Sequence, residues 1–160
     1  MVDLAKLQKV VREKYHPGFD YFYGDYYPWT PFSKELSAAK VALITTGGLH
    51  LKNDRPFDLI NELTGDPTFR VIPASTSLSE LMITHGHYDQ GQTEKDLNTV
   101  FPLERLRELK EEGFIGEVAP YHYSFRGYLP VYRPLMEVYA PQVAEQLKWA
   151  GVDAAVLTPA

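Results

Sequence analysis

The chain has 160 residues, enough for one domain with a hydrophobic core, and its 44% hydrophobic and 23% charged residues are ordinary for a soluble protein. A net charge of −5 argues against a protein that binds the phosphate backbone of nucleic acid. There is no cysteine, which excludes disulfides and thiolate sites, and neither a membrane span nor a signal peptide is evident, so we expect a cytoplasmic protein with no membrane partner.

The amino-terminal part combines a helical pattern with a run of aromatic residues. Leucine and valine recur at helical spacing from Asp3 to Tyr15, with Asp3 as the expected N-cap, and Pro17 and Gly18 end the pattern. Aromatic residues crowd the arm at 16–33. Tyrosine and tryptophan bury a large area and keep a polar tip, so this arm either packs on the domain or a second chain, or walls a ligand pocket.

Strand and helix patterns alternate along the rest of the chain. Residues 40–46 form a continuous apolar run, which is typical of a central parallel strand covered on both faces. A helical turn is expected at 57–63, strands at 69–73 and 78–84, a helix at 102–113, a strand at 117–123, a helix at 134–150 that Pro141 kinks or divides, and a buried strand at 152–157. This order predicts a single α/β domain spanning 1–160, with a mostly parallel sheet flanked by helices.

Polar residues follow the first predicted strand at 45–50, which reads Thr-Thr-Gly-Gly-Leu-His. Ligands gather beyond the carboxyl ends of strands in open α/β sheets. The glycines allow a sharp turn, so the loop is either a tight connection or a nest of N–H groups that holds a carboxylate or phosphate beside His50. The candidate anion-binding residues of this loop are Thr46, Gly47 and Gly48.

A second candidate site lies at 84–89, where two histidines and an aspartate alternate. In an extended segment His85, His87 and Asp89 point to the same side. Three interpretations stay open: hydrogen bonding within the fold, acid–base catalysis or substrate binding, and a metal site with nitrogen and oxygen ligands.

A third candidate site is the segment 120–128, which contains His122 and Arg126. A guanidinium group binds a carboxylate with two parallel hydrogen bonds, so Arg126 is a candidate substrate-binding residue. The alternative is a surface arginine with a histidine at an interface.

Several segments, taken in order, resemble the family of the B component of glycine, sarcosine and betaine reductase, which includes the D-proline reductase selenoprotein subunit. The resemblance spans roughly 35–160 and rests on the segments 40–52, 69–73, 84–89, 96–98, 100–109, 113–119 and 151–159. It implies reductive cleavage of a C–N bond by a selenocysteine or cysteine. A pyruvoyl-bearing subunit holds a small amine or amino acid as a Schiff base, the selenolate displaces the amine, and a thiol or selenol partner completes the reduction.

The resemblance also implies a selenocysteine or cysteine directly after Ala160, with no other cofactor in this chain. The 160 residues contain neither. Three explanations compete: a UGA codon read as a stop, a shortened chain, or a relative that lost redox chemistry. We favour the first two.

These observations lead to three expectations of function. The first is a reductase-complex subunit in which His50, His85 and His87, with Asp89, protonate the amine or stabilise the selenolate. The second is a metal-dependent enzyme that uses His85, His87 and Asp89. The third is a non-catalytic assembly module. We expect either a homo-oligomer or a complex with a pyruvoyl-bearing subunit.

Overall fold

The structure is a computed structural model that describes residues 3–14, 17–18, 29–60, 64–86, 90–93 and 95–160. The chain divides into two compact units, Met1–Ser33 and Lys34–Ala160, which we describe separately. Within the described ranges, the helices lack the length and apolar character that crossing a bilayer requires.

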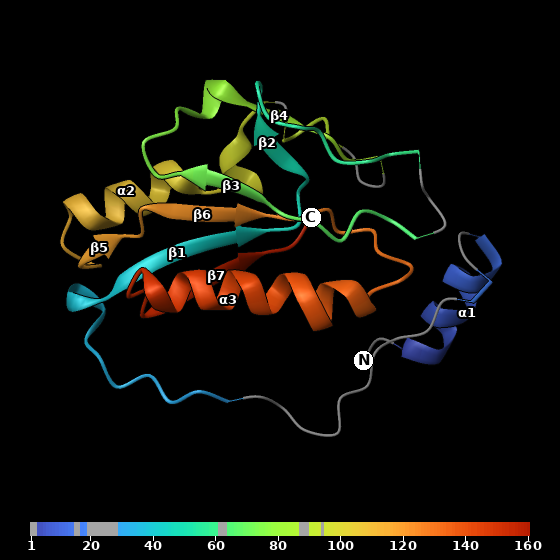
Figure 1. Cartoon of the computed structure of the whole chain (residues 1–160), viewed down its shortest axis with the longest axis horizontal. Coiled ribbons are helices and arrows are strands. Elements are labelled where there is room, and N and C mark those ends of the chain that lie inside the picture. The colour runs from blue at the N-terminus through green and yellow to red at the C-terminus, as the bar shows by residue number, and fades with distance from the viewer. Residues whose placement is uncertain (1–2, 15–16, 19–28, 61–63, 87–89, 94) are drawn as a thin grey trace. The chain divides into compact units, whose positions relative to one another are not determined.

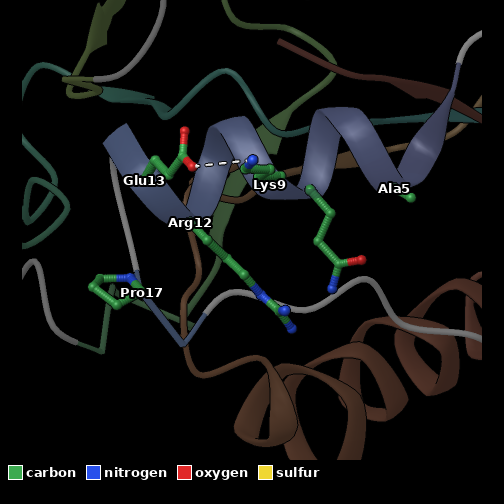
Figure 2. Close-up of a pocket in the computed structure, with 6 residues that line it drawn as sticks. Ala5, Lys9, Arg12, Glu13 and Pro17 are labelled. Carbon is green, nitrogen blue, oxygen red and sulfur yellow. Dashed lines mark ion pairs between the residues drawn. The ribbon is translucent and has the colours of Figure 1, made fainter.

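In the first unit, α1 (Leu4–Lys14) confirms the predicted amino-terminal helix. The carboxylate of Asp3 caps it, accepting hydrogen bonds of 3.1 and 3.2 Å from N–H groups of the first turn. Figure 2 shows the polar side of α1, where Lys9 and Glu13 form an exposed ion pair of 3.8 Å beside a surface hollow of about 420 Å³. Such a pair contributes about 0.3–0.5 kcal/mol, so it supports the helix and does not define a ligand site.

The predicted aromatic arm at 16–33 lies mostly outside the described residues, which include only 17–18 and 29–33 of it. Trp29, in the described part, is exposed. The role of the arm in packing, assembly or ligand binding stays a prediction.

The second unit is built around β1 (Lys40–Thr45), the predicted central strand (Figure 1). On one side β7 (Ala154–Thr158) pairs with it in parallel. On the other side β1 pairs in parallel first with β5 (Glu117–Val118) and then with β6 (Tyr121–Ser124). β3 (Arg70–Pro73) lies antiparallel to β6, and β2 (Leu49–Leu51) forms a separate antiparallel pair with β4 (Leu81–Ile83). The mostly parallel sheet confirms the predicted α/β class.

Among its described residues, this unit also contains two longer helices, a π-helical turn and three short 3₁₀ turns. α2 (Leu103–Glu111) follows Pro102, and Gly113 ends it with a φ of 77°. A π-helical turn (Leu135–Tyr139) leads into α3 (Ala140–Trp149), whose first turn contains Pro141. Helical residues run without a break from 133 to 149, so Pro141 does not divide this helix as one of the two alternatives predicted; instead the hydrogen-bonding pattern changes from π to α directly before this proline, which has no N–H group to donate. The 3₁₀ turns span Leu36–Ala38, Leu78–Glu80 and Leu97–Thr99.

Alternate residues of β1 belong to two cores on opposite faces of the sheet. Val41 and Leu43 pack in one core with Leu106 of α2. Ile44 packs in the other core with Val143 of α3. Helices therefore cover both faces at β1, which explains why this strand is an almost unbroken apolar run.

Three segments differ locally from the prediction. Residues 57–60 contain no helix, while 61–63 lie outside the described residues. The segment 78–84 begins as a 3₁₀ turn with a capping box at Ser77 and only then becomes β4, which pairs with β2 and not with the main sheet. The strand expected at 117–123 is broken into β5 and β6 next to Pro120, which has no N–H group to donate.

The expectation that the last strand is buried is wrong. In β7 the side chains of Val156 and Leu157 are 45% and 69% exposed. β7 pairs only with β1 among the described strands and therefore forms an edge of the sheet. The apolar sequence predicted a strand with two covered faces, but burial depends on neighbours that are distant in sequence.

Candidate active site at the strand ends

The carboxyl ends of β1, β6 and β7 meet at one place (Figure 1). The N–H of Thr46 donates to the carbonyl of Thr158 at 3.1 Å, and the N–H of Ala160 donates to Oγ1 of Thr46 at 3.0 Å. An antiparallel bridge joins Gly47 to Arg126, just beyond β6. Parallel strands bring their carboxyl ends to the same edge, so the sheet itself assembles this candidate site.

The predicted site residue His85 reaches these strand ends. Its ring is 5% exposed, and Nε2 accepts a hydrogen bond of 3.2 Å from the N–H of Gly127. Because Nε2 is the acceptor, the neutral ring carries its proton on Nδ1. Gly48 permits this approach: its φ is 67°, and a Cβ there would lie 2.6 Å from the Thr84 carbonyl and 3.1 Å from Cβ of His85.

Gly127 lies at the centre of the candidate site. A Cβ at this position would lie 3.3 Å from Oγ1 of Thr46 and 3.4 Å from both Nε2 of His85 and the carbonyl oxygen of Ala160. Three segments of the chain thus surround one glycine. Gly127 was not among the predicted site residues, although its place directly after a predicted strand was an available signal.

Arg126 is a buried cation with few partners. Its side chain is 1% exposed, Nη1 donates to the carbonyl of Asp58 at 2.8 Å, and its guanidinium lies 5.7 Å from the ring centre of Tyr128. Nε has no hydrogen-bond partner among the described residues, and no carboxylate there pairs with the guanidinium. A buried charge without a counter-ion is costly, so this arginine is the best candidate for binding an anion.

Arg70 provides the contrast. Its guanidinium lies 3.5 Å from the carboxylate of Asp66 and donates to the carbonyls of Arg55, Pro56 and Phe69. It also lies 4.2 Å from the ring centre of Phe57. Arg70 is thus fully engaged in the fold, whereas Arg126 is not.

A largely apolar pocket of about 300 Å³ lies next to Arg126, between the sheet and α3. Its lining includes Thr46, Arg126, Gly127, Val143 and Leu157. A small molecule with an acidic group and an apolar body would match this combination of one cation and apolar walls.

The Gly47–Gly48 loop does not present its N–H groups to an external anion. Gly47 N–H donates to Oγ1 of Thr45 at 3.0 Å, and Gly48 N–H donates to the carbonyl of Phe125 at 2.9 Å. Of the two interpretations left open, the tight connection describes this loop. The loop contributes to the candidate site by positioning Thr46 and by leaving space beside Gly48 for His85.

His50 lies in β2 and is buried, with both ring nitrogens engaged. Nδ1 lies 2.8 Å from the carbonyl of Leu51, and Nε2 lies 2.8 Å from Oγ1 of Thr84. The ring edge also meets Phe57, with 6.5 Å between ring centres. These contacts connect β2 to the end of β4, and the predicted catalytic role of His50 stays untested.

His122 is completely buried in β6. Nδ1 accepts a hydrogen bond of 2.9 Å from the N–H of Leu43, at the break between β5 and β6 where β1 has no strand partner on that side. Burial, and then the charge of Arg107, lowers the pKa of His122 to about 4. The ring is therefore neutral at pH 7. His122 was predicted as a substrate- or anion-binding residue together with Arg126, and that role stays a prediction.

The other two predicted residues of the second motif, His87 and Asp89, lie outside the described residues. The metal-site alternative with His85, His87 and Asp89 is therefore untested. Within the described ranges, no group of three histidine or acidic residues is arranged to hold a metal ion.

The fold and site define an α/β protein in which parallel strand ends gather a buried histidine and a buried arginine. The chain belongs to the glycine/sarcosine/betaine reductase selenoprotein B (GRDB) family, which it matches over residues 2–160. It is 44% identical over 130 residues to D-proline reductase subunit gamma of Acetoanaerobium sticklandii, covering 81% of this chain and 52% of that subunit.

Other relatives belong to multi-component reductase complexes. Glycine reductase complex component B subunit gamma of Symbiobacterium thermophilum is 33% identical over 84% of this chain and 31% of that subunit. Sarcosine reductase complex component B subunit beta of Peptoclostridium acidaminophilum is 32% identical over 76% of this chain and 28% of that subunit. The chain thus spans about half the length of the first relative and less than a third of the other two. No solved structure matches it.

Proposed function

We propose that this protein is a component of a reductase complex that cleaves the C–N bond of a small amine or amino acid, and that the site at the ends of β1, β6 and β7 is its reaction site. The observation that carries the proposal is the meeting of His85, Thr46 and Ala160 around Gly127. Family membership and the names of the relatives support the reaction class.

The proposed nucleophile is a selenocysteine or cysteine directly after Ala160, which is the position that the resemblance to the family implies; the 160 residues themselves contain no cysteine. Its selenolate or thiolate attacks the carbon that bears the nitrogen. The Se–C or S–C bond forms as the C–N bond breaks, and the leaving amine keeps the electron pair and takes a proton. A dithiol partner then supplies two electrons and two protons, releases the reduced product and becomes a disulfide. A pyruvoyl-bearing subunit would hold the substrate amine during the attack.

In this proposal His85 and Arg126 have different roles. The hydrogen bond from Gly127 to Nε2 of His85 places the proton of the neutral ring on Nδ1, and the role proposed for His85 is to protonate the leaving amine or to stabilise the selenolate. The buried guanidinium of Arg126 would hold the substrate carboxylate beside the apolar pocket. Chemistry that depends on free thiols also favours the reducing cytoplasm as the location.

A single-thiol experiment tests the nucleophile position. The chain extended by Cys-Gly-Gly after Ala160 would contain one thiol, and its alkylation rate by iodoacetamide would be measured against pH. We expect a thiol pKa below the ordinary value of about 8.5, because Gly127, the residue after the buried Arg126, lies close to both His85 and Ala160. His85→Ala should raise this thiol pKa. A control thiol at an exposed position, introduced by Ile60→Cys, should have the ordinary thiol pKa. The proposal would be contradicted if the thiol after Ala160 had the same pKa as the control thiol and this pKa did not change in His85→Ala.

A further inference from the structure

β7 is an edge strand without the features that normally protect an edge. Among the described strands it pairs with β1 alone. Its five residues, Ala154–Thr158, include no charged side chain and no proline. Natural proteins usually protect an exposed edge with charges, proline or a bulge, because free N–H and C=O groups invite another strand. The opposite edge, β3, contains Arg70 and ends at Pro73.

The two faces of β7 are open as well as its edge. Val156 is aligned with Leu43, and Leu157 is aligned with Ile44. Leu43 is buried in the core beneath α2, whereas Val156 beside it is 45% exposed. On the face of the sheet that α3 covers, Ile44 is only partly exposed, while Leu157 is 69% exposed. Coverage by the helices therefore stops at β1, and successive apolar residues of β7 face solvent on opposite sides of the sheet.

A groove continues this open region on one face. The apolar pocket of about 300 Å³ is lined by Leu157 of β7 and by Ala144 and Leu147 of α3. It offers space for an apolar side chain from an element packed against both β7 and α3. An edge and two faces that all lack cover fit a layered segment, a strand with helices on both sides.

We propose that the free edge of β7 pairs in parallel with a strand of a further polypeptide segment of the same family, the one that corresponds to the part of the curated relatives this chain does not span. Nearly half of D-proline reductase subunit gamma lies outside the match, which is enough chain for such a layered segment. Parallel pairing is favoured because all three strands that pair with β1 are parallel to it. The inference rests on family membership and on the open edge, and not on the proposed chemistry.

A second copy of this chain is the competing occupant. Two-fold symmetry would pair β7 with β7 in antiparallel fashion. A parallel strand instead brings its own carboxyl end to the edge where Thr46 and Gly127 lie, next to the pocket lined by Leu157. The parallel family segment therefore extends the wall of the candidate site as well as covering β7.

Co-expression tests this inference. The probe is the part of the Acetoanaerobium sticklandii subunit outside the match, tagged and co-expressed with this chain. We expect the two polypeptides to co-purify as one complex, in which the amide hydrogens of β7 exchange at least about tenfold more slowly than in the chain alone. Val156→Lys and Leu157→Lys should each weaken the complex by about tenfold or more, because each places a charge in an apolar contact.

The control variant is Ile60→Lys, which places the same charge on an apolar side chain that is 95% exposed and lies outside β7. It should leave the complex intact. The milder Leu157→Gln serves if a lysine variant fails to fold, which thermal unfolding monitored by circular dichroism would reveal. Three results would overturn the inference: no complex, a complex that tolerates every β7 variant, or a homodimer that these variants disrupt. None of these measurements depends on catalytic turnover, so a negative result would not contradict the proposed reaction.

Discussion

Nε2 of His85 accepts a hydrogen bond of 3.2 Å from the backbone N–H of Gly127, which lies 42 positions further along the chain. This contact attaches the segment after β4 to the end of β6, although β4 belongs to a separate two-stranded sheet. It also fixes which ring nitrogen of His85 carries the proton in the neutral state. The geometry depends on two residues that lack a side chain, Gly127 itself and Gly48, where a Cβ would press on the backbone of Thr84.

Gly48→Ala should therefore destabilise the protein, while Gly86→Ala should not. The substitution at Gly48 combines a φ of 67° with a contact of 2.6 Å to a backbone oxygen, so we expect a loss of about 1–3 kcal/mol in the free energy of unfolding. Gly86 is a matched control, because its φ is not positive and no atom lies within 4 Å of a Cβ built there. Urea unfolding of both variants measures the difference. Equal stabilities would show that the turn at Gly48 can relax without cost.

The buried His122 should make stability depend on pH. Its pKa is lowered from 6.5 to about 4 in the folded state, so the unfolded chain binds the proton more readily between these values. The contribution is fully present above pH 6.5 and is lost as the pH falls towards 4, by up to about 3 kcal/mol for this one group.

His122→Asn isolates that contribution, because its side-chain oxygen can still accept the hydrogen bond from Leu43 but does not titrate. The free energy of unfolding of both proteins would be measured by denaturant titration from pH 7 to pH 4. We expect the difference between them to shrink or reverse as the pH falls. A constant difference would mean that His122 keeps an ordinary pKa.

The sequence predicted the elements that depend on local pattern and missed those that depend on pairing. The apolar run of β1 and the proline-initiated α2 were recognisable from composition and spacing alone. The rule that sites gather at the ends of parallel strands pointed to the segment after β1, and the bridge between Gly47 and Arg126 joins that segment to the end of β6, a contact that the sequence did not predict. No local pattern could show that β7 lies at an edge, since that depends on which strands flank β1.

The histidines illustrate the same limit. A histidine in a chemically suggestive motif can equally be a partner for the backbone, and only long-range contacts decide between these roles. His122 accepts a hydrogen bond from Leu43 of β1, 79 positions away, because the break between β5 and β6 leaves that N–H without a strand partner. The N–H of Gly48 is likewise occupied by the carbonyl of Phe125, a contact that the Thr-Gly-Gly motif does not reveal.

Arg126 and Arg70 should respond differently to replacement by methionine, which keeps much of the volume and removes the charge. Arg70→Met leaves the carboxylate of Asp66 buried without its cation and should cost about 3–5 kcal/mol. Arg126→Met removes a charge that has no carboxylate partner among the described residues, so its stability should change by less than about 1 kcal/mol or increase.

The same pair of variants tests anion binding. Thermal unfolding would be followed with and without acetate, glycine or betaine, with chloride at equal ionic strength as the reference. A ligand that binds the folded state raises its melting temperature. We expect these carboxylates to stabilise the wild-type protein and to lose that effect in Arg126→Met. If the increase in melting temperature persists in Arg126→Met, the anion binds elsewhere in the protein. If the wild-type protein shows no increase, there is no preformed carboxylate site at Arg126.

His50 should prove to be a stabilising residue that acts through Thr84. The 2.8 Å contact between its Nε2 and Oγ1 of Thr84 connects β2 to the segment that delivers His85. A double-mutant cycle with His50→Ala and Thr84→Val should therefore give a coupling free energy of about 1 kcal/mol in unfolding experiments. In the chain extended by Cys-Gly-Gly, His50→Ala should leave the thiol pKa unchanged, whereas His85→Ala should raise it. The reason is that no described contact of His50 involves Gly127 or Ala160. If His50→Ala alters the thiol as strongly as His85→Ala while the protein remains folded, His50 acts in the site directly, as its place in the sequence motif first indicated.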